Sequence, residues 1–146
     1  MKVDTFTGAV DEAAVVAAIR EAEARSTAEV RVHVSSQSPE DVEAAAAAMF
    51  EKLGMTKTEA RNGVLLYIAP KRQKFAILGD SGIHTRCGPD FWKEIAGVVS
   101  EDFRGGRFTD GIVKGVARAG DVLAKHFPRT GSRPDTNELS DDVSKD

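Results

Sequence analysis

Three polar residues, Glu29, Asn62 and Asp80, are the strongest candidates for chemistry in this sequence. Each stands at one end of a segment with the apolar pattern of a β-strand: Glu29 near the start of the first segment, Asn62 at the start of the second, and Asp80 at the end of the third. Carboxylate and amide oxygens are hard donors, which suit calcium or magnesium better than zinc. If the three strand ends meet, the sequence predicts a divalent-cation site, for calcium or alternatively magnesium.

The connections between these segments predict that the strand ends do meet. The strands are expected at residues 28–34, 62–69 and 75–80, with a helix that begins at Pro39 and ends at Gly54 between the first two. A strand, a helix and a strand form a crossover unit, which makes the two strands parallel. The turn into the third strand is too short for a crossover, so this pair must be antiparallel. The end of the third strand then lies beside the starts of the other two.

The first strand alternates strictly between apolar and polar residues. Its valines fall on one face, and Glu29, Arg31 and His33 fall on the other. Strict alternation is typical of a strand with one buried face and one face that is solvated or functional. Arg31 therefore shares its face with one of the candidate ligands.

Helical periodicity predicts three further helices, over about residues 10–25, 89–100 and 108–127. The expected fold class is α/β, with a small mixed β-sheet (a parallel crossover pair plus an antiparallel hairpin) layered with about four α-helices. Residues 1–127 are expected to form this single domain. Residues 128–146 have little to bury and are expected to form an acidic, flexible tail.

Composition excludes several classes of function. The chain has 146 residues and a net charge of -3, which gives no support for nucleic-acid binding because phosphate neutralisation needs clustered Lys and Arg. A single cysteine, Cys87, rules out an internal disulfide and fits a reducing compartment. The N-terminus lacks the apolar core of a signal peptide, and no segment reaches the length of a membrane span. A cytoplasmic protein without direct membrane insertion is expected.

Each candidate ligand also has a purely structural interpretation. Asp80 could cap the turn that follows its strand, and Asn62 with Gly63 could form the turn before the next strand. Asp110, at the start of the last helix, could add a ligand to the same site or could simply favour the positive end of that helix.

Two arginines are candidates for holding an anion. Arg31 could hold a phosphate oxygen near the carboxylates, or could pair with a carboxylate on a solvated sheet face. Arg104 begins an Arg-Gly-Gly-Arg loop that could cradle an anion through its backbone N–H groups, or could be a flexible connector between two helices.

Four segments together resemble the TPM-domain family: AEVRV (28–32), RNGVLLYIA (61–69), GDSGI (79–83) and FRGGRF (103–108). The resemblance implies a small mixed sheet layered with helices, a divalent-cation site usually thought of as calcium, and the acid phosphatase activity reported for plant members. Most members look secreted or membrane-anchored. This sequence is similar instead to a soluble bacterial subgroup without a signal peptide or membrane span.

The function expected from these observations is divalent-cation binding, through Glu29 and Asp80 with Asn62 as a neighbour, in a regulatory or partner-binding role. One alternative is a metal-assisted acid phosphatase that acts on phosphomonoesters, so whether the protein is an enzyme stays open at this point. Another is a metal-independent protein-interaction domain. Such a domain would use the acidic tail or a stripe of small residues in the last helix: Gly111, Gly115 and Ala119.

Overall fold

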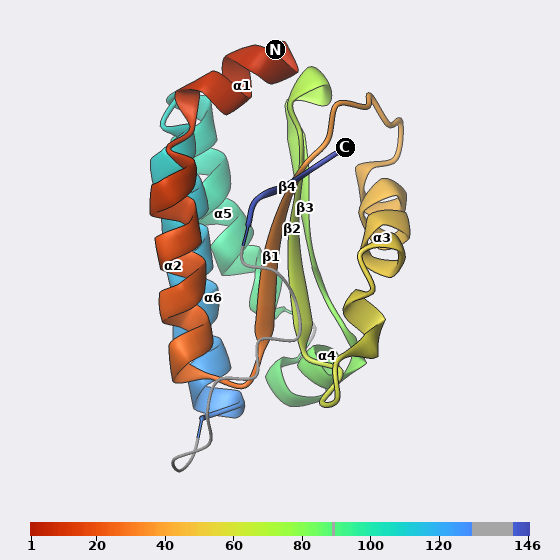
Figure 1. Ribbon diagram of the computed structural model, residues 1–146, viewed down its shortest axis with the longest axis vertical. Helices are drawn as coiled ribbons and strands as arrows, with labels where there is room; N and C mark the ends of the chain where they lie inside the picture. Colours follow the sequence, from red (N-terminus) through yellow and green to blue (C-terminus); the bar gives the residue numbers. More distant parts are fainter. Residues whose placement is uncertain (89, 130–141) are drawn as a thin grey trace.

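A four-stranded mixed sheet stands between two layers of helices in the computed structural model of the protein, which describes residues 1–88, 90–129 and 142–146 (Figure 1). The strand order is β3-β2-β1-β4. The strands are β1 (Glu29–Val34), β2 (Gly63–Ala69), β3 (Lys74–Gly79) and β4 (Ser144–Lys145). The mixed α/β class expected from the sequence is confirmed.

The expected strand directions are also confirmed. β1 pairs with β2 in parallel, with Glu29 opposite Gly63, and β2 pairs with β3 in antiparallel fashion, with Val64 opposite Gly79. A 3-10 turn over Pro70–Arg72 makes the short connection between β2 and β3. The sequence did not predict β4, which pairs in parallel with the outer edge of β1. Residues 130–141 of the expected tail lie outside the described residues.

Six α-helices lie within the described residues, against the four expected. They are α1 (Val3–Ala9), α2 (Glu12–Arg25), α3 (Val42–Lys52), α4 (Ser81–Cys87), α5 (Phe91–Arg104) and α6 (Phe108–His126). Helices α2, α5 and α6 cover one face of the sheet and α3 covers the other, while α1 and α4 lie at opposite ends (Figure 1).

The helix expected over about residues 10–25 is found as α2, but α1 before it was not expected, α3 begins later than expected and α5 ends later than expected. The chain breaks after α1, and α2 starts afresh because the Asp11 carboxylate accepts the Ala14 N–H (3.2 Å). Helix α3 begins at Val42 rather than Pro39, because Asp41 is the N-cap and accepts the Ala44 N–H (3.0 Å). The helix expected over about residues 89–100 is found as α5, which continues to Arg104, and α4 precedes it in a segment where no helix was expected.

On the polar face of β1, Glu29 and His33 are buried and Arg31 is half-buried, so of the two alternatives expected for this face, solvated or functional, the solvated one is wrong. This face of β1 lies on the side of the sheet that α3 covers by packing on β2 and β3, and only 5% of Glu29 and 1% of His33 are exposed. His33 is accommodated by polar partners: its Nδ1 lies 2.9 Å from Ser144 Oγ and its Nε2 lies 3.3 Å from an Asp146 oxygen. Burial lowers the pKa of His33 despite this carboxylate, which favours the neutral ring.

The small-residue stripe of α6 is covered by the protein itself. A Cβ on Gly115 would lie 2.6 Å from Val99 Cγ2 of α5, and one on Gly111 would lie 2.9 Å from the Phe103 ring. Ala119 is 4% exposed. The stripe lets α5 and α6 approach closely and is therefore not a surface for a second protein, which corrects that part of the expectation.

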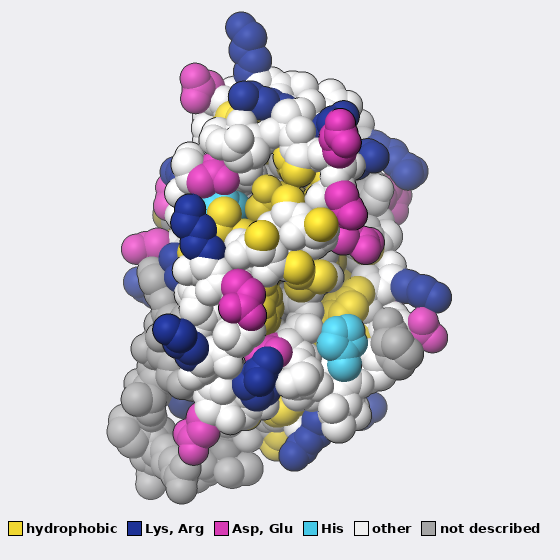
Figure 2. All heavy atoms as spheres, turned by 90° about the vertical axis from the view of Figure 1, so that its right-hand side faces the viewer, with side chains coloured by type: hydrophobic (Ala, Val, Ile, Leu, Met, Phe, Trp, Pro, Cys, Tyr) yellow, Lys and Arg dark blue, Asp and Glu magenta, His cyan; other side chains and the backbone are white. Residues whose placement is uncertain are grey.

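The surface over α3 carries Lys and Arg interspersed with Asp and Glu, with hydrophobic groups visible between them (Figure 2). This face therefore has no large area of one charge. Among the helices that the structure describes, none combines the length and apolar character needed to cross a bilayer.

Candidate functional site

The structure brings the starts of β1 and β2 and the end of β3 to one edge of the sheet. Glu29 is paired with Gly63, and the Asp80 N–H donates to the Gly63 carbonyl oxygen (3.0 Å). Glu29, Asn62 and Asp80 are respectively 5%, 1% and 7% exposed. The predicted convergence of these three residues at one edge is confirmed. Because all three are buried, each polar side chain also needs hydrogen-bond partners within the protein.

Asp80 is held by a bidentate ion pair with Arg61. Arg61 Nε donates to Oδ2 (2.7 Å) and Nη2 donates to Oδ1 (2.8 Å), while the Ser81 N–H donates to Oδ1 (2.8 Å). Burial acts to raise the pKa of Asp80, but the hydrogen bonds and charge of Arg61 and the Ser81 N–H outweigh it and lower that pKa. Asp80 is thus an ionised N-cap of α4, so its structural interpretation is confirmed.

Arg61 is the residue of this site that sequence reasoning missed. Its backbone is left-handed (φ 52°), a conformation that costs a non-glycine residue of order 1–2 kcal/mol. Two hydrogen bonds hold it there: its N–H donates to the Thr58 carbonyl (3.2 Å), and its carbonyl accepts the Gly82 N–H (2.9 Å). Nothing in the spacing of Arg61 and Asp80 along the chain indicates their pairing, because it arises from the return of β3.

Glu29 lies on the same face of the sheet as Asp80, two strands away, with β2 between them. Neighbouring strands are separated by roughly 4.8 Å, so the two backbones are about 10 Å apart with Gly63 between them. A Cβ on Gly63 would lie 3.1 Å from the Met55 carbonyl oxygen and 3.4 Å from the Phe50 ring. These groups partly fill the space between the two carboxylates. Within the parts of the chain that the structure describes, no three His, Cys, Asp or Glu side chains are grouped as ion ligands.

Asn62 secures the loop before β2. Its Nδ2 donates to Thr27 Oγ1 (3.2 Å), and its backbone N–H donates to Thr58 Oγ1 (3.3 Å). The side chain therefore ties the entry of β2 to the residues that lead into β1. The Asn62 side chain therefore contacts Thr27 rather than Asp80, and its role here is to hold this edge of the sheet in place.

The remaining candidates do not gather at this edge. Arg31 lies in the middle of β1, opposite Leu65, and is half-buried. Arg104 ends α5 at the opposite end of the sheet, where it lines a pocket with residues of the β2–β3 turn. Asp110 is exposed in the first turn of α6, next to Thr109, which accepts the Asp11 N–H (3.0 Å) near that same end. Neither Arg104 nor Asp110 can share a site with Asp80.

A pocket of about 520 Å³ opens beside Asp80, on the side of Arg61. Its polar lining includes Arg61, Ser81, Thr85 and Arg86. The Arg86 guanidinium donates to the His126 carbonyl (3.2 Å) and lies 5.4 Å from the centre of the Phe127 ring. The guanidinium groups, together with the hydroxyls of Thr27, Ser81 and Thr85, make this pocket suited to an anion.

Comparison with known proteins places the chain in a family. The TPM domain matches residues 3–122, so the protein belongs to the TPM domain family. Its structure is similar to that of the BA42 protein from the psychrophilic bacterium Bizionia argentinensis, with 39% identity over 92% of each chain and a TM-score of 0.84.

A more distant structure shares the fold alone. The N-terminal domain of a protein from P. gingivalis is 19% identical, over 79% of this chain and 76% of that one, with a TM-score of 0.63. A search of curated proteins gives no match.

Gly82 permits the close approach that forms the Arg61–Asp80 pair, and its substitution tests this. A Cβ at Gly82 would lie 2.5 Å from the Ala60 carbonyl oxygen and 2.7 Å from that of Arg61, neither of which is a flexible group. Gly82→Ala should therefore lower the free energy of unfolding by about 1–3 kcal/mol in urea denaturation.

The matched control is Gly97→Ala on the exposed side of α5, where a Cβ would meet nothing within 4 Å. This variant should raise the free energy of unfolding by about 0.5–1 kcal/mol, because alanine favours helix. Equal effects of the two substitutions would show that the approach of α4 to residues 60 and 61 is not tight.

Proposed function

We propose that the protein is a divalent-cation-binding TPM domain, for calcium or alternatively magnesium, and that the ion is held at Asp80 in place of the Arg61 guanidinium. The observation that carries the proposal is that the buried Asp80 carboxylate already holds a positive charge through both of its oxygens. The side chain that supplies this charge is 50% exposed, against 6% for that of Asp80. Arg61 can therefore leave for solvent while Asp80 stays in place.

Competition between Arg61 and a cation follows from simple electrostatics. Removing a partner from a buried charge is costly unless another positive charge takes its place. A divalent ion supplies more charge than a guanidinium and prefers carboxylate oxygens. Glu29, which is buried at the same edge, is the second carboxylate that we propose for the site. The proposed role is regulatory, because the bound ion would order this edge of the sheet and the start of α4.

The proposal predicts opposite effects of two substitutions on calcium binding. Calcium at about 100 times its Kd should stabilise the wild-type protein by about 2.7 kcal/mol. Asp80→Asn should abolish this stabilisation. Arg61→Gln should lower stability without calcium but increase the stabilisation by calcium, since the competing charge is gone.

Thermal unfolding at increasing calcium, repeated with magnesium, measures these effects. Asp110→Asn is the matched control, because it removes the same charge from an exposed position at the other end of the sheet. It should respond to calcium as the wild type does. A wild-type melting temperature that does not change in millimolar calcium or magnesium would refute the proposal.

The pocket beside Asp80 favours a second candidate, a metal-assisted acid phosphatase. Arg61 and Arg86 could bind phosphate oxygens there, and the ion would supply polarisation of the phosphoryl group. Arg104, at the opposite end, has no part in this candidate.

Hydrolysis of p-nitrophenyl phosphate by the purified protein tests the enzymatic candidate. Under this candidate, activity requires calcium or magnesium and falls by at least about tenfold in both Asp80→Asn and Arg86→Gln, because each removes a group that positions the phosphate or the ion. Full activity in Asp80→Asn would mean that the activity arises elsewhere.

A further inference from the structure

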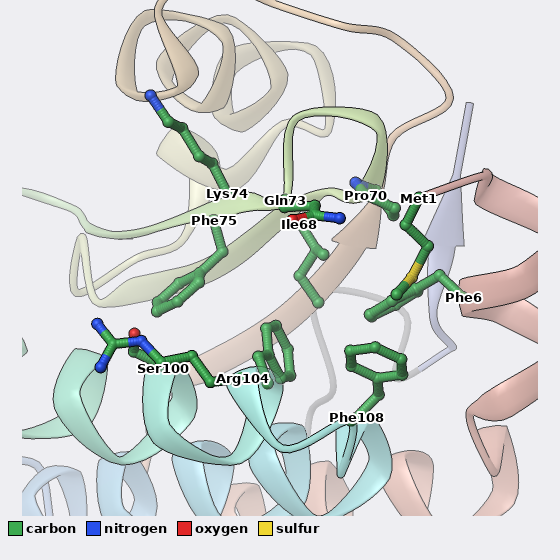
Figure 3. A pocket seen from close by; sticks show the side chains of 12 residues that line it. Met1, Phe6, Ile68, Pro70, Gln73, Lys74, Phe75, Ser100, Arg104 and Phe108 are labelled. Carbon is green, nitrogen blue, oxygen red and sulfur yellow. The ribbon is translucent and has the colours of Figure 1, made fainter.

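A second pocket, of about 570 Å³, lies at the end of the sheet opposite to Asp80 (Figure 3). It is formed by α1, the β2–β3 turn, the end of α5 and the start of α6. Its volume is in the range of sites for small organic ligands. It belongs neither to the proposed cation site nor to the pocket beside it, since they share no lining residue.

Aromatic rings make the walls of this pocket. Phe103 contacts Phe6, Phe75 and Phe108 with ring centres 5.9, 5.6 and 5.6 Å apart, all edge-on, and Phe6 lies 4.9 Å from Phe108. These four rings come from four different elements, so they hold one another in place. Phe75, Phe103 and Phe108 are only half-buried, which leaves apolar surface that an aromatic ligand could remove from water.

The guanidinium of Arg104 brings a positive charge to this aromatic surface. Arg104 extends along α5 so that its guanidinium lies beneath Phe75 and beside Ser100, whereas Lys74 points away from the rings (Figure 3). None of the described residues that line the pocket is an Asp or Glu. Within the described residues Arg104 takes part in no ion pair, while Arg107 of the same loop pairs with Asp102 (3.0 Å).

We propose that this pocket binds a small organic anion with an aromatic body, of the arylalkanoate class, in which a short alkyl chain joins the ring to the carboxylate. The aromatic body would pack among Phe75, Phe103 and Phe108, and the carboxylate would accept hydrogen bonds from the guanidinium of Arg104 and the hydroxyl of Ser100. A planar guanidinium can donate two parallel hydrogen bonds to a carboxylate, and its positive charge repels cationic ligands that have a similar aromatic body. The occupant is thus identified by charge complementarity together with the aromatic lining.

The test is a titration of the 15N-labelled full chain with 3-phenylpropionate, followed by amide NMR in the presence of EDTA. EDTA removes divalent ions, so the outcome does not depend on the cation site. The expected result is a set of saturable shifts confined to the amides around residues 73–75 and 100–108. The neutral analogue 3-phenylpropanamide and the simple anion acetate should each bind at least about tenfold more weakly. The amide lacks the negative charge that pairs with Arg104, and acetate lacks the aromatic ring.

Substitutions then assign the binding to this pocket. Arg104→Gln should weaken 3-phenylpropionate binding by about tenfold or more, and Phe75→Leu should weaken it while keeping an apolar side chain. Arg118→Gln is the charge-matched control, since Arg118 is exposed on α6 and pairs with Glu94 (2.9 Å). It should change binding by less than about twofold, within the scatter expected of distant surface sites.

Several results would overturn the proposal. The proposal is wrong if 3-phenylpropionate causes no saturable shifts, or if the neutral amide binds equally well. It is also wrong if Arg104→Gln binds 3-phenylpropionate as the wild type does. If the same amides shift when the protein alone is concentrated, a second copy of the chain occupies the pocket and the small-anion proposal is wrong.

Discussion

The central position of β2 is the constraint on which the rest of the structure depends. All seven of its residues are buried, because helices cover the sheet on both sides and a strand pairs with each of its edges. The short turn after β2 forces β3 to return antiparallel, and its ladder continues into the hydrogen bond from the Asp80 N–H to the Gly63 carbonyl (3.0 Å). That bond places a carboxylate beside the starts of two parallel strands. The same return places an aromatic residue, Phe75, at the opposite end.

The two ends of the sheet consequently have different chemistry. At one end the buried polar side chains have partners: Asp80 pairs with Arg61, and Asn62 donates to Thr27. At the other end the apolar rings are only half-buried, and the nearby guanidinium of Arg104 is not committed to a carboxylate of the described residues. In the two proposals, a cation at the first end would replace an existing partner of Asp80, whereas an organic anion at the second end would cover apolar surface that is still exposed. The two proposals are therefore physically independent.

The sequence predicted those features that depend on short-range patterns. Strand directions followed from connection lengths, and the convergence of Glu29 and Asp80 followed from those directions. The expectation of a solvated polar face on β1 failed, because alternation cannot distinguish a solvated face from one on the side that α3 covers. On this face His33 contacts Ser144 and Asp146, which are more than a hundred residues away in the sequence.

Long-range pairing also explains the other omissions. Arg61 is nineteen residues from Asp80, and its left-handed backbone has no sequence signal, since such a conformation is typical of glycine rather than arginine. The aromatic pocket could not be predicted because its rings come from four separate elements. The break between α1 and α2, in contrast, had a local signal in Asp11, whose capping role was overlooked.

The central claim is that the Arg61 guanidinium pairs with the Asp80 carboxylate and is displaced from it when a divalent ion binds. The most direct measurement is the NMR signal of the Arg61 Nε–H, which donates to Asp80 (2.7 Å). As calcium is added, the account predicts that this signal moves to the position and the fast solvent exchange of a free arginine, in step with shifts of the Asp80 and Ser81 amides. A signal that stays unchanged at saturating calcium would contradict the account.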